Sequence, residues 1–169
     1  MKKLGLFLVM MTALCFLLTG IGLAQDDIKK NPSCKYCGMD REKFAFSRML
    51  IEYEDGTSEG TCSLHCLAVE LALNIDKTPK AILVGDLNTK KLIDAEKGFW
   101  VMGGKKMGIM TKRGKWAFAK KEDAEKFKAE NGGDATTFDL AIKAAYEDMD
   151  ADTKMIRDRR KMKRMQHKH

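Results

Sequence analysis

The sequence predicts an α+β fold in which two small units follow one another, with a long C-terminal helix and a basic tail after them. Three observations lead to this prediction. Short apolar runs of strand-like composition alternate with longer segments whose apolar residues recur at helical spacing. Turn residues, including an Asp-Gly pair and clusters of glycine, separate these segments. The order is strand–strand–helix–strand in the first half and strand–strand–helix in the second.

The first residues have the features of a secretory signal peptide. Lys2 and Lys3 precede an apolar run over residues 4–18, and small residues occupy the positions before the expected cleavage point. The pattern predicts cleavage after Ala24, which places the protein in the periplasm or outside the cell. An uncleaved membrane anchor is the alternative, although the run is short for a span. Cys15 lacks the small preceding residue of a lipidation site, so we do not expect a lipoprotein.

The positive charge of the chain is concentrated at its C-terminus. The 169 residues carry a net charge of +7, and residues 154–169 alone contain eight Lys and Arg against one Asp. Residues 25–153 contain 21 basic and 23 acidic side chains. We therefore expect no nucleic-acid binding, because the body is slightly acidic. The composition, 44% apolar and 33% charged, also excludes a polytopic membrane protein and favours a folded domain over disorder.

The first unit is predicted from a hairpin signal followed by an amphipathic helix. Asp55-Gly56 lies between two short runs of strand character, as in a β-hairpin. Apolar residues then recur at helical spacing from Leu64 to Ile75, and Pro79 follows the end of this pattern. The elements that we expect are strands at 49–53 and 58–62, a helix at about 63–75 and a strand at 81–84.

The second unit repeats this order after a glycine-rich connection. A charged helix with Ala124 and Phe127 facing inward is expected to end at Gly132. A final helix starts near Thr137 and can continue into the basic tail. The expected elements are strands at 98–102 and 115–118, a helix at 121–130, and the final helix with Phe138, Ile142, Ala145, Tyr146 and Met149 on one face.

The segment Cys34-Lys35-Tyr36-Cys37-Gly38-Met39 is the first concentration of chemically active residues. It holds two thiols and a thioether within six residues. Soft sulfur ligands select Cu(I), and thiolates alone also suit Zn²⁺. Because a thioether adds nothing for zinc, Met39 favours copper. A disulfide or redox pair and half of a zinc site are the alternatives. A thioredoxin-type site is disfavoured, because no strand precedes the motif.

Cys62, His65 and Cys66 form the second concentration. At about 100° per residue these three side chains lie on one face of the expected helix, opposite Leu64 and Leu67. They also lie at the helix N-terminus, where the helix dipole favours a thiolate. We interpret them as candidate ligands, with a disulfide to the first Cys pair or a half-buried thiol as alternatives. Four Cys and one His suffice for one closed zinc site or for one or two copper sites.

Methionines recur in two further places. Met102, Met107 and Met110 surround glycines in the second half, where a flexible loop could close its thioethers over Cu(I), and core packing is the alternative. The tail carries Met155, Met162, Met165, His167 and His169 among Lys and Arg. We interpret this tail as a solvated arm. Weak copper binding, or contact with a membrane surface or an acidic partner, is the alternative.

The segment at 34–39 is followed by Tyr53-Glu54-Asp55-Gly56, and later by Gly108-Ile109-Met110 before Trp116-Ala117-Phe118. This series resembles the NosL family of nitrous oxide reductase accessory proteins over roughly residues 34–140, and Cys-x-x-Cys-Gly-Met is its most specific part. The resemblance implies a periplasmic Cu(I) chaperone of denitrification that supplies the copper-sulfur centre of the reductase. It also implies two ββαβ-type units, a fold shared with a domain of organomercurial lyase.

The resemblance implies Cys37 and Met39 as copper ligands, with Cys34 beside them, and Met110 as the family methionine before an Ala-Phe strand. Three features differ from the family pattern. Family members are typically lipoproteins, whereas this chain lacks a lipidation motif. The segment from Cys62 to Cys66 and the Met- and His-rich tail are additional. The client can therefore differ from nitrous oxide reductase.

The leading hypothesis is a metallochaperone, not an enzyme, that binds Cu(I) and hands it to a copper enzyme by ligand exchange. The candidate ligands are Cys34, Cys37, Met39, Met110, Cys62, His65 and Cys66. A thiol-disulfide redox or mercurial-handling protein and a zinc-stabilised interaction module are the alternatives. A shared site requires the four thiols to converge. We expect the domain at residues 25–153, with halves at about 34–90 and about 95–140, and the tail at 154–169.

Overall fold

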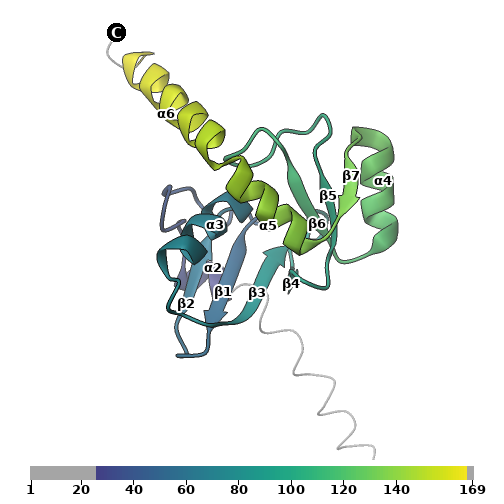
Figure 1. The fold of residues 1–169 in the computed structure, drawn as a ribbon, viewed down its shortest axis with the longest axis horizontal. Helices are drawn as coiled ribbons and strands as arrows, with labels where there is room; N and C mark the ends of the chain where they lie inside the picture. Colours follow the sequence, from purple (N-terminus) through teal and green to yellow (C-terminus); the bar gives the residue numbers. More distant parts are fainter. Residues whose placement is uncertain (1–25, 167–169) are drawn as a thin grey trace, which may run out of the picture.

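The computed structural model describes residues 26–166 (Figure 1). The expected signal peptide at residues 1–24 lies outside the described residues, as do His167 and His169 of the tail. No helix in the described part is long and apolar enough to cross a membrane. The fold is α+β, with two small antiparallel sheets and a C-terminal helix, as the sequence predicted.

The first sheet has the strand order β2-β1-β3-β4 and is antiparallel throughout. The predicted hairpin is confirmed, and Gly56 in its turn has φ +80°, a conformation that favours glycine. A short helix, for which the sequence analysis has no counterpart, precedes the sheet. The elements are α2 (Asp26–Lys30), β1 (Met49–Tyr53), β2 (Ser58–Thr61), α3 (Leu64–Leu73), β3 (Pro79–Gly85) and β4 (Leu92–Asp94).

Helix α3 is buried on more than one side. Leu64, Leu67 and Leu71 pack into the core beneath the first sheet, while His65, Cys66 and Glu70 on its other sides are buried as well. The predicted helix is confirmed, and its burial extends beyond the leucine face to the face that carries the candidate ligands. The helix also ends at Leu73, so that Ile75 lies beyond it and is 82% exposed. Ile75 does not extend the apolar face, contrary to the prediction.

The second sheet has the order β6-β5-β7 and forms a ββαβ unit with one helix. Gly132 ends that helix as predicted, with φ +74° and its N–H donating to the Lys128 carbonyl. The elements are β5 (Phe99–Met102), β6 (Lys115–Phe118), α4 (Lys121–Asn131) and β7 (Asp134–Thr136). Strands β4 and β7 were not predicted, because three residues of mixed polarity show no strand periodicity. They form by pairing with the edges of β3 and β5.

The final helix continues into the basic tail, as the sequence allowed. It consists of α5 (Phe138–Glu147) and α6 (Met149–Gln166), separated at Asp148, whose backbone keeps right-handed helical angles. α5 lies against α3, and α6 extends away from the body (Figure 1). Phe138 and Ala145 are buried as expected, but Tyr146 is 45% exposed, so its predicted inward orientation is wrong.

Two apolar clusters meet at the second sheet. The larger lies between the first sheet, α3 and α5, and includes Trp100 and Ala117 from β5 and β6. The smaller lies between the opposite face of the second sheet and α4, where Val101, Trp116 and Phe127 are buried. The alternation of Trp100 and Val101 along β5 thus places successive side chains in different clusters. The two units share one of these cores.

Candidate metal centre

Four cysteines converge at one end of the first sheet. Cys34 and Cys37 lie in the loop before β1, Cys62 follows β2, and Cys66 lies in the first turn of α3. Their sulfur atoms all lie within 4.8 Å of one another, with Cys37 3.4 Å from Cys62 and Cys62 3.8 Å from Cys66. All four are free thiols, so the disulfide interpretation is not supported. Cys37 alone among the four is partly exposed.

The hairpin and the turn of the first loop bring these cysteines together. The loop at residues 33–40 is closed by a bridge between its ends, and Gly38 within it has φ +72°. The Gly38 N–H donates to the Cys34 carbonyl at 2.9 Å, and the Cys34 N–H donates to the Met39 carbonyl at 2.8 Å. The two thiols of the motif are therefore held on one tight turn beside the start of α3.

Glu70 connects this loop to α3, one turn beyond Cys66. Its carboxylate is buried and accepts hydrogen bonds from the hydroxyls of Tyr36 and Tyr53, the second at 2.8 Å. Lys35 forms an ion pair with the same carboxylate at 3.4 Å. Burial and the neighbouring Glu70 raise the pKa of both tyrosines well above their usual range. Both residues between the two cysteines of the motif thus contact the helix that carries Cys66.

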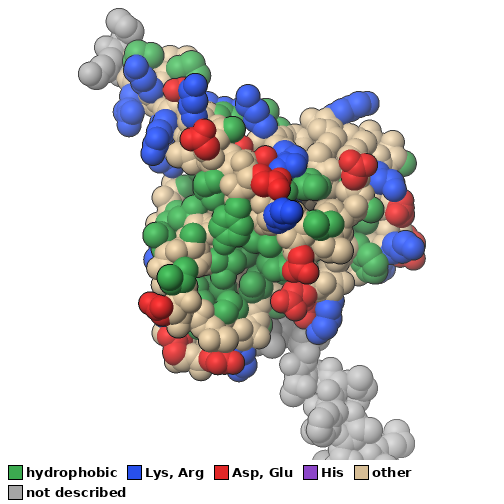
Figure 2. All heavy atoms as spheres, viewed as in Figure 1, with side chains coloured by type: hydrophobic (Ala, Val, Ile, Leu, Met, Phe, Trp, Pro, Cys, Tyr) green, Lys and Arg blue, Asp and Glu red, His purple; other side chains and the backbone are tan. Residues whose placement is uncertain are grey.

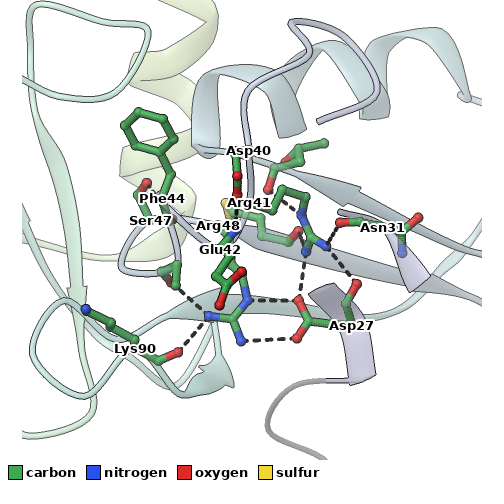
Figure 3. Close-up of polar contacts among 12 residues, drawn as sticks. Asp27, Asn31, Asp40, Arg41, Glu42, Phe44, Ser47, Arg48 and Lys90 are labelled. Carbon is green, nitrogen blue, oxygen red and sulfur yellow. Dashed lines mark hydrogen bonds and ion pairs between the residues drawn. The ribbon is translucent and has the colours of Figure 1, made fainter. Parts of the chain in front are cut away.

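A buried group of charges supports the other side of the loop (Figure 3). The Asp27 carboxylate accepts hydrogen bonds from Arg41 at 2.9 Å and from Arg48 at 2.8 Å, and both guanidiniums are almost fully buried. Burial lowers the pKa of Arg41, and Asp27 partly offsets this effect. Carbonyls of Asp27, Asn31, Met49 and Thr61 accept the other Arg41 hydrogen bonds. Arg41 thereby joins α2, the hairpin and the chain that leads into Cys62.

The four thiols affect one another's ionisation. Hydrogen bonds from the other three cysteines hold the pKa of Cys34 far below its usual range. Cys34 opposes the ionisation of Cys37, but hydrogen bonds from Cys62 and Cys66 outweigh it, and the pKa of Cys37 is also lowered. The pKa values of Cys62 and Cys66 are raised, because these thiols donate to Cys34 and Cys37 and are buried. The cluster thus favours ionisation of Cys34 and Cys37 and opposes ionisation of Cys62 and Cys66.

Met39 and Met110 are the described methionines that pack against the cysteine cluster. Met39 follows the turn of the motif, and Met110 comes from the long connection between β5 and β6. Met110 has φ +63°, an uncommon conformation for a residue with a side chain. The two thioethers suggested by the sequence thus lie beside the four thiols, although they are 71 positions apart in the numbering.

The structure places His65 away from the four sulfur atoms. The His65 Nδ1 atom faces the Asp152 carboxylate of α6 at 3.6 Å, and both side chains are buried. Burial lowers the pKa of His65, and the charge of Asp152 partly offsets this effect. His65 is not among the atoms that lie within 4.8 Å of one another. The shared helix face predicted for Cys62, His65 and Cys66 therefore does not bring His65 into the cluster.

The remaining candidate methionines are dispersed. Met102 lies in β5, and Met107 is 49% exposed with its sulfur accepting a hydrogen bond from Arg159 at 3.3 Å. On α6, Met155 is half-buried, whereas Met162 and Met165 are exposed among Lys and Arg. Figure 2 shows these basic side chains along α6. The tail is therefore helical up to Gln166, and its residues from 157 to 166 are exposed to solvent.

Glu70 and Arg41 are supporting residues that sequence reasoning missed. Each is a charged side chain in a segment without a recognisable motif, and each is buried only because its partners come from distant positions. Asp152, which faces His65 from α6, was missed for the same reason. The one available signal was the position of Lys35 and Tyr36 between two cysteines, which could have suggested that a partner of these two residues, here Glu70, supports the site.

The sulfur atoms are gathered closely enough to share one metal ion. A tetrahedral Zn–S₄ site with bonds of about 2.3 Å has sulfur–sulfur distances of about 3.8 Å. The cluster, with one pair of sulfurs at 3.4 Å, another at 3.8 Å and all of them within 4.8 Å of one another, is close to such a set before any ion binds. Two or three of the same sulfurs also suit Cu(I), which accepts low coordination numbers with soft ligands.

An α+β fold whose loop and helix gather four free thiols is typical of thiolate metal-binding proteins. The family model for NosL matches residues 25–146, and the chain therefore belongs to the NosL family. The crystal structure of the copper chaperone NosL from Shewanella denitrificans has a similar fold, with a TM-score of 0.50 and 24% sequence identity. The match covers 63% of this chain and 87% of that chain. No curated protein sequence matches this chain.

Proposed function

We propose that this protein is a metallochaperone that binds Cu(I) through sulfur ligands. The observation that supports the proposal is the convergence of four free thiols with the thioethers of Met39 and Met110 beside them. Cys34 and Cys37 are the primary ligands in this proposal, because their pKa values are lowered and thiolates bind copper most strongly. The donor set also includes Met39, Met110, Cys62 and Cys66. His65 is not a ligand in this proposal, because it faces Asp152 and orients α6.

The partial exposure of Cys37 suits a protein that transfers its metal. A Cu(I) ion bound by two or three sulfurs leaves a position at which donors of a second protein can enter. Ligand exchange then moves the ion without releasing it into solvent. The copper chaperone whose fold is similar supports this role. We propose delivery to a periplasmic copper enzyme, such as nitrous oxide reductase, after export by the signal peptide, and no enzymatic activity of the chaperone itself.

The exposed basic residues of α6 suit contact with an anionic membrane surface near the client. Residues 154–166 contain seven Lys and Arg and one Asp, and the C-terminal end of this helix extends beyond the body (Figures 1 and 2). Co-sedimentation with anionic vesicles that is lost at high salt would test this contact. Equal sedimentation with neutral vesicles would contradict it.

A zinc-stabilised module is the second candidate function, because four thiols at nearly tetrahedral distances can close around Zn²⁺. The two candidates differ in which residues matter. Zinc would need all four cysteines and no methionine, whereas copper would use Met39. Structural zinc would also remain bound through purification, and its removal by a chelator would unfold the protein.

Titration of the reduced protein with Cu(I) against a competing chelator such as bicinchoninate separates these functions. We expect one tight equivalent, its loss in Cys37→Ser, and about tenfold weaker binding in Met39→Ala, since one soft donor is removed. Met162→Ala is the matched control, because Met162 is exposed on α6, and it should bind as the wild type does.

Normal Cu(I) affinity in Cys37→Ser and Met39→Ala would refute the copper proposal. Circular dichroism of each variant shows whether it is folded, so that loss of binding is not confused with loss of structure. One retained zinc ion together with unfolding on chelation would instead support the zinc module.

A further inference from the structure

A groove lies along the inner side of α6, next to the cysteine cluster. Its volume is about 340 Å³, and its lining includes three methionines, Met39, Met110 and Met155. Met39 and Met110 also pack against the cysteines, so the groove and the cluster share two thioethers. Met155 adds a third sulfur from α6, and Gly108, Ile109, Ile156, Arg159 and Arg160 complete the lining.

Contacts at two points hold α6 over this groove. Near the start of the helix, Asp152 faces His65 and accepts a hydrogen bond from the Lys112 N–H at 3.3 Å. Two turns further on, Arg160 donates to the Cys37 carbonyl at 3.2 Å. Met155 lies between these positions at helical spacing, on the side of α6 that faces the cluster. Its place beside Met39 and Met110 is therefore fixed by contacts on both sides.

We propose that Met155, together with Met39 and Met110, forms a thioether transfer site through which Cu(I) passes between the surface and the thiols. This proposal rests on the proposed Cu(I) chaperone function and specifies its route. Thioethers are neutral soft donors that bind Cu(I) without losing a proton. The lining contains no carboxylate, so the groove lacks the charged oxygen ligands on which Mg²⁺ and Ca²⁺ sites depend.

The transfer is a ligand exchange without a change of oxidation state. As a bond from copper to a cysteine sulfur forms, a bond from copper to a methionine sulfur breaks. The thiol proton, where one is still present, passes to solvent. Met39 and Met110 can take part in both sites because they contact both the groove and the cluster.

The charges of the groove favour transient contact with Cu(I) over stable binding of the ion. Arg159 and Arg160 line it, and their guanidiniums oppose a resident cation. The thiolates of the cluster have the opposite effect and attract the ion. The NosL family model ends at residue 146, before α6 begins, so Met155 is a donor outside the matched region.

Methyl NMR of protein labelled with ¹³C at the Met methyl groups tests this site, with Ag(I) as a redox-stable probe for Cu(I). Up to one equivalent, signals of Met39 and Met110 should shift, because both pack against the thiols of the cluster. Beyond one equivalent, the Met155 signal should shift, while that of Met102 in β5 stays in place. A Met155 signal that does not move with excess Ag(I) would overturn the proposal.

Rapid mixing with the Cu(I)–bicinchoninate complex tests the route. Met155→Leu preserves volume but removes the sulfur, so we expect loading to slow by about three- to tenfold while the tight equivalent is retained. Met165→Leu, an exposed methionine of the same helix that does not line the groove, is the matched control. Equal loading rates in wild type and Met155→Leu would refute the transfer site. Absence of any tight equivalent in wild type would instead refute the chaperone function.

Discussion

At Glu70, one buried carboxylate accepts hydrogen bonds from Tyr36 and Tyr53 and pairs with Lys35. Glu70→Gln retains the size of the side chain but removes its charge. Hydrogen bonds to a charged group contribute about 1.5–3 kcal/mol each, so we expect unfolding free energy to fall by about 1–3 kcal/mol. The loop at residues 33–40 should also loosen. Urea unfolding measures the first effect, and native-state thiol labelling of Cys34 measures the second.

Glu59→Gln is the matched control for this prediction. Glu59 also pairs with Lys35, at 3.2 Å, but on the surface. Exposed ion pairs contribute about 0–1 kcal/mol, so stability and labelling should stay close to those of the wild type. If Glu70→Gln labels no faster than Glu59→Gln, the loop is held by other contacts, and the role assigned to Glu70 is wrong.

The candidate ligands could be predicted from the sequence, but their arrangement could not. Cysteines and methionines stand out as soft donors wherever they occur, so Cys34, Cys37 and Met39 were identified by residue type and spacing alone. Whether Cys62 and Cys66 share a site with them depends on the hairpin between, which turns the chain back. The orientation of His65 depends on Asp152, 87 positions later, and no local periodicity carries that information.

At the scale of elements, Asp148 fixes the junction of α5 and α6 to the second sheet. Its Oδ2 atom accepts hydrogen bonds from Arg113 Nε and from Lys115 Nζ, both at 2.8 Å. Partial burial opposes its ionisation, but these two cations outweigh burial and hold its pKa below the usual value. A lowered pKa in the folded state contributes stability above the unfolded pKa of about 3.9 and loses it as the pH falls further.

Asp148→Asn should therefore destabilise the protein by about 1–2 kcal/mol at pH 7, since charge-assisted hydrogen bonds are lost. The difference from wild type should shrink below about pH 4, where the carboxyl of the unfolded wild-type chain takes up its proton, and should vanish at still lower pH, where the folded carboxyl is protonated too. Urea unfolding of both proteins between pH 3 and pH 7 measures this. Asp150→Asn, an exposed carboxylate in the first turn of α6, is the control and should show little effect. A difference independent of pH would mean that the charge of Asp148 contributes nothing.

Elements were predictable where local chemistry determines them. The hairpin of β1 and β2 follows from Asp55-Gly56, and the end of α4 follows from Gly132. By contrast, β4 and β7 form because a sheet edge is available to pair with, and their three-residue sequences show no strand periodicity. The burial of α3 on several sides depends on the loop at residues 33–40, which covers the helix face that periodicity assigned to the candidate ligands.

At the scale of the whole molecule, the two units should unfold together. Trp100 of β5 is 2% exposed and lies in the core cluster of the first sheet, where its ring packs 5.9 Å from that of Phe138. Its Nε1–H donates to the Ala95 carbonyl at 2.8 Å. One side chain of the second unit thus fills the core of the first. Neither half can bury its apolar surface without the other, so we expect cooperative unfolding.

Trp100→Phe tests whether the two units unfold together, because each unit of this variant can be followed by its own probe. The chain has two Trp, so the variant leaves Trp116, in the cluster beneath α4, as the single fluorescent reporter of the second unit. Pulsed labelling of the four thiols reports on the first unit. We expect both signals to change at one urea concentration, with the free energy of unfolding lower by about 1–3 kcal/mol because packing and a hydrogen bond are lost.

Phe99→Leu, at the exposed neighbouring position, should leave the midpoint nearly unchanged. Two separate transitions would show that the halves are independent domains, and the thiol site would then depend on the first unit alone.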